Sequence, residues 1–92
     1  MKKIAVIPNY TKDIEYKYTK RLCSYLEGKA HIVMQDKDRI DEINADYTVG
    51  CVYEDVDAVI ILGGDGTILH MAKAATRNNL PILGINIGTM GF

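Results

Sequence analysis

The chain has 92 residues, of which 48% are hydrophobic and 25% are charged, and its 11 basic and 12 acidic residues leave a formal net charge of −1. This length allows one small domain with one modest core, and this composition is typical of a globular protein rather than a disordered one. The balanced charge gives no sign of a nucleic-acid or anionic-membrane partner, and no apolar run approaches the ~20 residues that a membrane span needs.

The cysteines and the N-terminus indicate a cellular compartment. Cys23 and Cys51 are too few for a disulfide framework and belong to no C-x-x-C pattern. The opening residues, MKKIAVIPN, become polar too early for a signal peptide. We therefore expect a cytoplasmic protein with reduced, structural thiols.

The first half of the chain predicts a strand, a helix and a second strand. Residues 2–8 form a short β-branched run that is typical of a buried strand, and residues 30–35 form another. Between them, residues 11–28 change to a period of about four, which predicts a helix ended by Gly28. The expected buried face of this helix consists of Ile14, Tyr18, Leu22 and Leu26. Residues 36–55 are acidic and weakly patterned, which predicts a loop with a short helical piece.

The second half repeats the alternation. Residues 56–63 (VDAVIILG) carry the strongest strand signal in the chain, and residues 81–88 (PILGINIG) predict a fourth strand. A helix is expected between them, from about Thr67 to Asn78–Asn79. The residues spaced for its packed face are Ile68, Leu69, Ala72, Ala75 and Thr76.

Strands that alternate with helices predict parallel pairing through right-handed crossovers, and hence an α/β fold with a small doubly wound, Rossmann-like sheet. The last expected strand leads into a glycine-rich turn, with no further helix to cover that side of the sheet. We therefore expect the 92 residues to be a piece of a longer protein.

Two glycine-rich stretches, residues 63–66 and 84–91, follow expected strands. Ligands of open α/β sheets bind outside the carboxyl ends of the strands. Glycine permits positive φ and close approach to a ligand, and a helix beginning near Thr67 would direct N–H groups at an anion. The first stretch, residues 63–66, is not a P-loop, because no lysine follows its glycines. It is not a Rossmann fingerprint either, because Leu69 stands where the third glycine belongs.

Asp65 stands among these glycines, where a phosphate would repel it. One explanation is an N-cap, in which the carboxylate accepts a hydrogen bond from an early helical N–H and contributes about 1 kcal/mol. The other is chemical: the carboxylate binds Mg²⁺ or accepts the proton of a hydroxyl that attacks phosphorus. Phosphoryl transfer depends mainly on positioning and charge compensation, so one well-placed aspartate suffices as the base. The loop is therefore typical of a kinase.

Two motifs carry a resemblance to a known family. GGDGT, at residues 63–67, resembles the signature shared by NAD kinases, diacylglycerol and sphingosine kinases and, in a variant form, 6-phosphofructokinases. PILGINIGTMGF, at residues 81–92, is similar to the G-[IV]-N-x-G-x-x-G-F segment of NAD kinases. The lipid kinases usually follow GGDGT with an Asn-Glu pair, which ILHM lacks here. The resemblance covers essentially the whole chain, residues 1–92, as the N-terminal domain of a two-domain NAD kinase.

The resemblance implies an activity and the roles of several residues. NAD kinases transfer a phosphoryl group from ATP, or in some members from polyphosphate, to the 2′-hydroxyl of the adenosine ribose of NAD, with a divalent metal such as Mg²⁺. Asp65 would accept the proton of that hydroxyl, and the backbone of Gly66 would contact the dinucleotide. His70 would contact the nucleotide, where the alternative is a solvent-facing histidine with no role. Phe92 would line the adenosine pocket.

Asn86 has two interpretations, a turn residue with local side-chain bonds or a ligand contact. The full set of residues predicted to bind nucleotide is Gly64, Asp65, Gly66, Thr67, His70, Asn86 and Phe92. No metal ligand is assigned, although Asp65 could serve as one.

The resemblance also implies what lies outside these residues. The second, mostly β, NAD-binding domain of the family would follow Phe92, and without it the chain would not catalyse alone. The full-length protein would form a homodimer or homotetramer, and its other partners would be small-molecule nucleotides. Two alternatives remain: a sister kinase acting on a lipid or sugar phosphate, and a nucleotide-binding module without chemistry.

Overall fold

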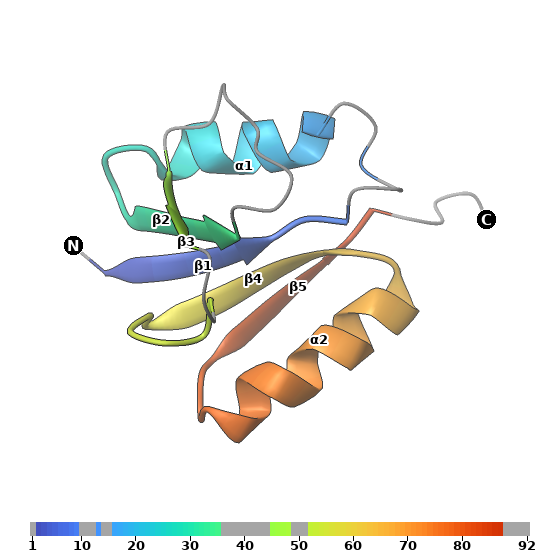
Figure 1. Ribbon diagram of the computed structural model, residues 1–92. Helices are drawn as coiled ribbons and strands as arrows, with labels where there is room; N and C mark the ends of the chain where they lie inside the picture. Colours follow the sequence, from blue (N-terminus) through green and yellow to red (C-terminus); the bar gives the residue numbers. More distant parts are fainter. Residues whose placement is uncertain (1, 10–12, 14–15, 36–44, 49–51, 88–92) are drawn as a thin grey trace.

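A computed structural model of the chain describes residues 2–9, 13, 16–35, 45–48 and 52–87. These residues form a parallel sheet with a helix on each face (Figure 1). In chain order the elements are β1 (Lys3–Ile7), α1 (Lys17–Leu26), β2 (His31–Gln35), β3 (Asp46–Thr48), β4 (Ala58–Gly63), α2 (Asp65–Arg77) and β5 (Ile82–Asn86). None of the helices in this part of the chain is long and apolar enough to cross a membrane.

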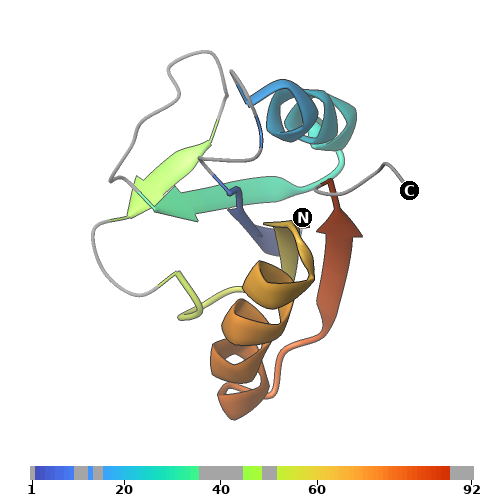
Figure 2. The same ribbon diagram turned by 90° about the vertical axis from the view of Figure 1, so that its right-hand side faces the viewer.

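The five strands lie in the order β3-β2-β1-β4-β5, and every neighbouring pair is parallel. The chain moves from β1 through α1 toward one edge of the sheet and from β4 through α2 toward the other. The two helices consequently cover opposite faces, as the end-on view shows (Figure 2). The predicted α/β, doubly wound fold class is confirmed.

The core consists of two apolar layers, one on each face of the sheet. On the α1 face the buried residues are Val6, Cys23, Leu26, Ile32, Met34, Ile60 and Leu62. On the α2 face they are Ala5, Val52, Val56, Val59, Ile61 and Ala75. Successive residues of a strand point to opposite faces, so a strand that is covered on both sides must be apolar at every position. This explains why β1 and β4 are continuous apolar runs.

The sequence did not predict β3, which lies in a segment expected to be a loop with a short helical piece. Its three residues pair with β2, in the register Val33↔Asp46 to Gln35↔Thr48. A strand of this length carries no readable alternation, and its conformation depends on the neighbour with which it pairs. Residues 36–44 lie outside the described residues, so the expected helical piece is not tested.

The buried face of α1 agrees with the predicted one in part, because Leu26 is buried and Leu22 packs against the core. Its buried residues are Thr19, Cys23 and Leu26, whereas Tyr18 is 44% exposed. Ile14 lies outside the described residues. The difference arises at the start of the helix, where Asp13 is buried and accepts hydrogen bonds from the backbone N–H groups of Tyr18 (2.9 Å) and Thr19 (2.8 Å) and from the Thr19 hydroxyl. The N-cap position itself is Tyr16, and the Asp13 carboxylate serves the N–H groups of the first turn, where Thr19 is buried.

We expect Asp13→Ala to lower the free energy of unfolding by about 2 kcal/mol, because it removes the acceptor for three donors at a buried helix start. Urea unfolding followed by circular dichroism measures this loss. Asp57→Ala is the matched control, since the Asp57 carboxylate accepts one exposed hydrogen bond from the backbone N–H of Lys3; it should cost under about 0.5 kcal/mol. Equal losses in the two variants would contradict the capping role.

Cys23 is a free, buried thiol of the α1-face core, in agreement with the predicted structural role; Cys51 lies outside the described residues. Burial raises the pKa of the Cys23 thiol from its ordinary 9.0 to about 11, because the thiolate would be desolvated. Between these two values the unfolded chain loses this proton while the folded chain retains it. Stability is therefore expected to fall as the pH rises from 9 to 11.

The pH effect can be assigned to Cys23 by comparison with Cys23→Ala. We expect the unfolding free energy of the wild type to fall more steeply than that of Cys23→Ala between pH 9 and 11, with parallel profiles at lower pH. The subtraction removes every contribution that the two proteins share. Parallel profiles throughout would show that ionisation of Cys23 does not affect folding.

Helix α2 begins at Asp65, two residues before the expected start, and ends at Arg77. Its contacts with the sheet include Ile68, Ala72 and Ala75, as predicted. Two predicted members of that face, Leu69 (63% exposed) and Thr76, are exposed instead. Only one side of α2 packs on the sheet, and the predicted face included Leu69 and Thr76, which lie outside that side.

Candidate functional site

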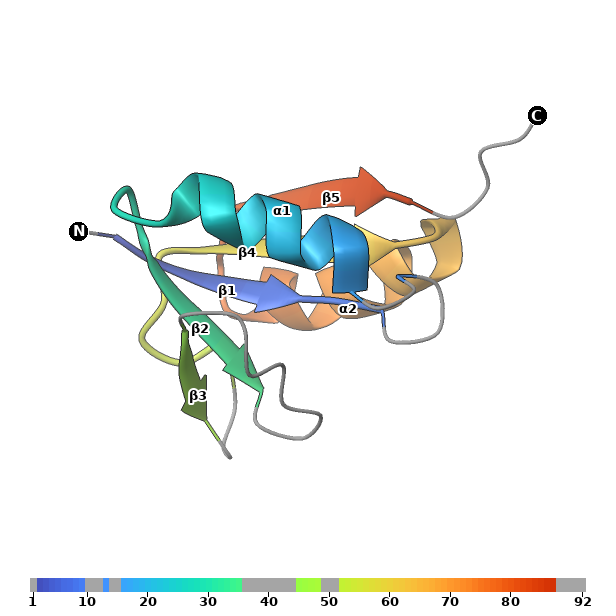
Figure 3. The same ribbon diagram turned by 90° about the horizontal axis from the view of Figure 1, so that it is seen from above.

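The carboxyl ends of β1, β4 and β5 converge at the start of α2. β1 pairs with β4 up to Ile7↔Ile61, and β4 pairs with β5 up to Gly63↔Asn86. From β1 the chain turns toward α1, and from β4 it turns toward α2, which lie on opposite sides of the sheet when it is viewed from above (Figure 3). This is the topological switch point of the sheet, where open α/β proteins bind their ligands.

The turn from β4 into α2 is made by the GGDGT residues. Gly64 is the N-cap of α2, with φ −90° and ψ 178°, and the N–H of Ile68 donates the first helical hydrogen bond to its carbonyl (3.0 Å). The N-cap carries no side chain, and no side-chain cap bond is made there. The interpretation of Asp65 as the N-cap is therefore wrong: Asp65 is the first helical residue, and its carboxylate is left for another role.

The glycines of the site differ in what surrounds them. A Cβ at Gly63 would lie 3.1 Å from Cβ and Cγ2 of Thr67, and a Cβ at Gly84 would lie 2.8 Å from Cγ2 of Ile68. These two glycines let the first turn of α2 lie directly on β4 and β5. A Cβ at Gly66 would meet nothing within 4 Å. Positive φ is not their function, because among the described glycines only Gly28 has it.

We expect Gly84→Ala to destabilise the fold by about 1–3 kcal/mol, because the new methyl group would overlap the branched methyl of Ile68. Thermal or urea unfolding measures the loss. Ile68→Leu moves the branch one carbon further out, so the double variant Gly84→Ala/Ile68→Leu should recover part of the stability. A Gly84→Ala variant as stable as the wild type would contradict the close packing inferred here.

Two side-chain amides hold the first turn of α2 from the strands on either side of β4. From β5, Nδ2 of Asn86 donates to Oδ1 of Asp65 at 2.6 Å. From the end of β1, Nδ2 of Asn9 donates to Oγ1 of Thr67 at 3.0 Å. These bonds join residues 21 and 58 positions apart, so Asn86 does not act only through local turn bonds. Neither bond has a signal in the sequence, because the partners lie far apart along the chain.

The remaining predicted residues are less closely associated. His70 is exposed on α2, and five residues of helix turn a side chain by about 140°, so it leaves the helix in a different direction from Asp65. Phe92 lies outside the described residues. Among those described, Asp65, Thr67 and Asn86 therefore form one cluster with Gly64 and Gly66, and His70 lies further along the helix.

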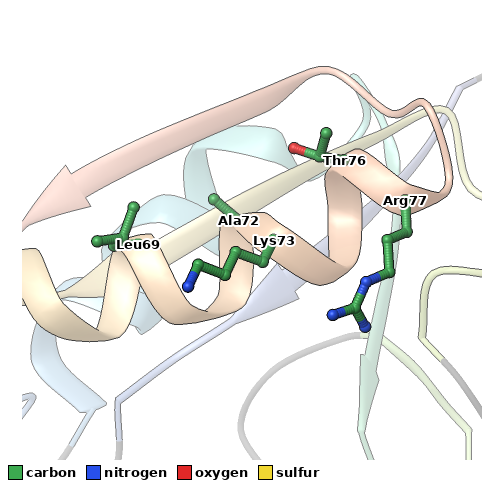
Figure 4. Close-up of a pocket in the computed structure, with 5 residues that line it drawn as sticks. All are labelled: Leu69, Ala72, Lys73, Thr76 and Arg77. Atoms are coloured by element: carbon green, nitrogen blue, oxygen red, sulfur yellow. The ribbon is translucent and has the colours of Figure 1, made fainter.

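A shallow hollow of about 390 Å³ lies along one side of α2 and contains none of the predicted site residues. Its lining residues, drawn in Figure 4, are Leu69, Ala72, Lys73, Thr76 and Arg77. The hollow reflects the exposed Leu69 side of the helix, and we do not assign it to the site. The polar cluster at the start of α2 is the candidate site.

The cluster offers one carboxylate, that of Asp65, and the N–H groups at the start of α2. Asp65 is exposed, and in the described part of the chain the Asn86 amide is the hydrogen-bond donor found at its carboxylate. The same part of the chain contains no group of three or more histidine, cysteine, aspartate or glutamate side chains that could hold a metal ion. The first-turn N–H groups of α2 favour an anion, and the carboxylate favours a proton donor or a cation beside it.

A doubly wound parallel sheet with such a cluster at its switch point is typical of α/β domains that bind nucleotides and phosphates. Comparison with known families is more specific: the profile of the ATP-NAD kinase N-terminal domain matches residues 4–92. The chain belongs to the ATP-NAD kinase family. The resemblance inferred from GGDGT and GINIGTMGF is thereby confirmed.

Individual relatives agree with this assignment. Over its whole length, the chain is 43% identical to the NAD kinase of Ruminiclostridium cellulolyticum and covers 33% of that protein. It is 38% identical to the NAD kinase of Lachnoclostridium phytofermentans, of which it covers 32%, and 38% identical to that of Acetivibrio thermocellus, of which it covers 33%. The chain thus spans about a third of the length of these curated relatives.

Proposed function

We propose that residues 1–92 are the N-terminal α/β domain of an NAD kinase, and that the full-length protein phosphorylates the 2′-hydroxyl of the adenosine ribose of NAD to give NADP. ATP or inorganic polyphosphate is the phosphoryl donor. Membership of the family supports the reaction class. The observation that carries the proposal is the exposed carboxylate of Asp65 at the start of α2, with one oxygen hydrogen-bonded to Asn86.

In the proposed reaction Asp65 is the general base. The 2′-hydroxyl oxygen attacks the terminal phosphorus of the donor, and its proton passes to Oδ2 of Asp65, the oxygen that does not accept the Asn86 bond. The new O–P bond forms as the bond from phosphorus to the bridging oxygen breaks, and ADP or the shortened polyphosphate leaves. Since the transition state makes few covalent demands on the protein, positioning and charge compensation supply most of the rate.

The backbone of the cluster at Gly64, Gly66 and Thr67 is proposed to bind and orient the nucleotide. Backbone N–H groups of Gly64, Gly66 and Thr67 lie at the amino end of α2, where an anion is favoured. The open space above Gly66 admits the dinucleotide close to the backbone. His70 and Phe92 are proposed to contact the nucleotide because the family resemblance assigns them that role.

The proposed divalent cofactor is Mg²⁺. Magnesium is usually bound through one or two carboxylates together with substrate phosphates rather than by an all-protein cage, so the phosphates of the donor would supply much of its coordination. When bound to the donor, Mg²⁺ neutralises the charge that develops on the transferred phosphoryl group. We assign no protein ligand set to the ion.

The remaining two thirds of the relatives' length are proposed to include the β-rich domain that completes the NAD site. The 92 residues alone would then supply the catalytic loop without turning over substrate. Cytoplasmic location stays a prediction from the cysteines and the N-terminal sequence, and a homodimeric or homotetrameric assembly stays a prediction from the family.

An acceptor screen of the full-length protein tests the proposal. With ATP and Mg²⁺ present, NAD should be phosphorylated, whereas diacylglycerol, sphingosine and sugar phosphates should not. Turnover of a lipid or sugar phosphate in place of NAD would assign the chain to the sister kinases. Nucleotide binding without turnover of any acceptor would favour a binding module.

A further inference from the structure

We propose that Asn86 is a positioning residue that acts on the reaction through Asp65 rather than by touching the nucleotide. The inference rests on the proposed function, and it assigns Asn86 a positioning role in place of the predicted nucleotide contact. Asn86 ends β5, and Asp65 begins α2, so the bond between them links two separate elements across the site.

The geometry of the bond distinguishes the two oxygens of the carboxylate. Oδ1 of Asp65 accepts the Asn86 amide at 2.6 Å, which is a short distance for a nitrogen donor, and a charged acceptor such as a carboxylate favours short hydrogen bonds. An aspartate side chain at the first position of a helix would otherwise sample several rotamers. Fixing Oδ1 holds the plane of the carboxylate and leaves Oδ2 as the oxygen presented to a hydroxyl.

The backbone that carries Asp65 is fixed independently. Asn9 holds Thr67 from β1, and the close contacts at Gly63 and Gly84 set the first turn of α2 on β4 and β5. With the backbone held in this way, Asp65 can still rotate about its side-chain torsions, and the hydrogen bond from Asn86 restrains that rotation. A displacement of about 1 Å in a reacting group can cost about 100-fold in rate.

A purely structural role for this bond would have little to stabilise. Both Asp65 and Asn86 are exposed, and a hydrogen bond between exposed polar side chains contributes modestly to folding. We therefore expect loss of the Asn86 amide to be visible in kcat while thermal stability changes little.

A double-mutant cycle in the full-length protein tests the inference. Asn86→Leu removes the amide at nearly constant size and should lower kcat for NADP formation by about 10- to 100-fold, with less than about a 3-fold change in KM for NAD. In an Asp65→Ala background the same change should alter kcat by less than about 2-fold, because no carboxylate remains to be positioned. Asn86→Asp, which keeps the shape and replaces the donor by an acceptor, should lower kcat at least as much.

Asn78→Leu is the matched control. Asn78 is also an exposed asparagine associated with α2, and its Nδ2 donates to the carbonyl of Ala74 at 2.9 Å at the far end of the helix. It should leave kcat and KM unchanged, and thermal unfolding of every variant should stay close to that of the wild type.

The outcomes are distinguishable. An unchanged kcat in Asn86→Leu, or an equal loss with and without Asp65, would overturn the positioning role, and a large rise in KM for NAD would instead identify Asn86 as a nucleotide contact. Absence of NADP formation by the folded wild type would overturn the proposed function itself, and this inference with it. Loss of kcat that depends on Asp65 supports the inference.

Discussion

Asp65→Asn should lower kcat for NADP formation by the full-length protein by about 1,000-fold, within the range of about 100- to 10,000-fold that a general base contributes. Asparagine has nearly the same size as aspartate and can still accept the Asn86 hydrogen bond through its carbonyl oxygen. It cannot accept the proton of an attacking hydroxyl. The substitution therefore removes the chemistry and keeps the geometry.

The fold should be unaffected, because Asp65 is exposed and makes no N-cap bond. Circular dichroism and thermal unfolding of the variant should match the wild type. Asp55→Asn is a suitable control, since Asp55 is exposed with φ 60°, a left-handed conformation that asparagine adopts readily. It should retain full activity. A folded Asp65→Asn variant with normal turnover would exclude Asp65 as the base.

Gly66→Ala is expected to weaken the binding of NAD without lowering the stability of the fold. A Cβ at Gly66 would meet no atom within 4 Å, and alanine is the better helix former by up to about 1 kcal/mol, so the variant should be as stable as the wild type or more stable. If the dinucleotide approaches the backbone here, the added methyl group occupies its space. We expect KM for NAD to rise by about 10-fold or more.

Isothermal calorimetry with NAD and thermal unfolding, measured on the same full-length samples, check this expectation. Gly84→Ala provides the contrast, because there the added methyl meets Ile68 within the protein and should lower stability. A Gly66→Ala protein that binds NAD normally would show that the space above Gly66 is not used by the dinucleotide. A destabilised Gly66→Ala protein would contradict the open space itself.

Much of the fold could be predicted because the strands that matter are covered on both faces. β1 and β4 read as continuous apolar runs, which their positions at the centre of the sheet explain. The glycine loop after β4 predicted the place of the candidate site. Because the loop matches neither the P-loop nor the Rossmann pattern, its aspartate, Asp65, was the distinctive residue. The strand order, which creates the switch point between β1 and β4, has no local signal and depends on tertiary packing.

The features that the sequence did not predict involve side-chain hydrogen bonds that have no recognisable pattern in the sequence. Tyr18 matched the apolar period of α1, yet Thr19, which donates to the buried carboxylate of Asp13, is buried in its place. Asp65 carried an N-cap signal, yet Gly64 takes that position and Asn86 binds the carboxylate. In both cases the outcome involves side-chain hydrogen bonds, on which hydrophobic periodicity carries no information.

The decisive measurement is the initial rate of NADP formation from NAD, ATP and Mg²⁺ by the full-length wild-type protein, with NADP identified as the 2′-phosphorylated product. We predict steady formation of NADP that requires ATP or polyphosphate. A folded wild type that binds nucleotide but forms no NADP would contradict the proposal that this chain carries the catalytic loop of an NAD kinase.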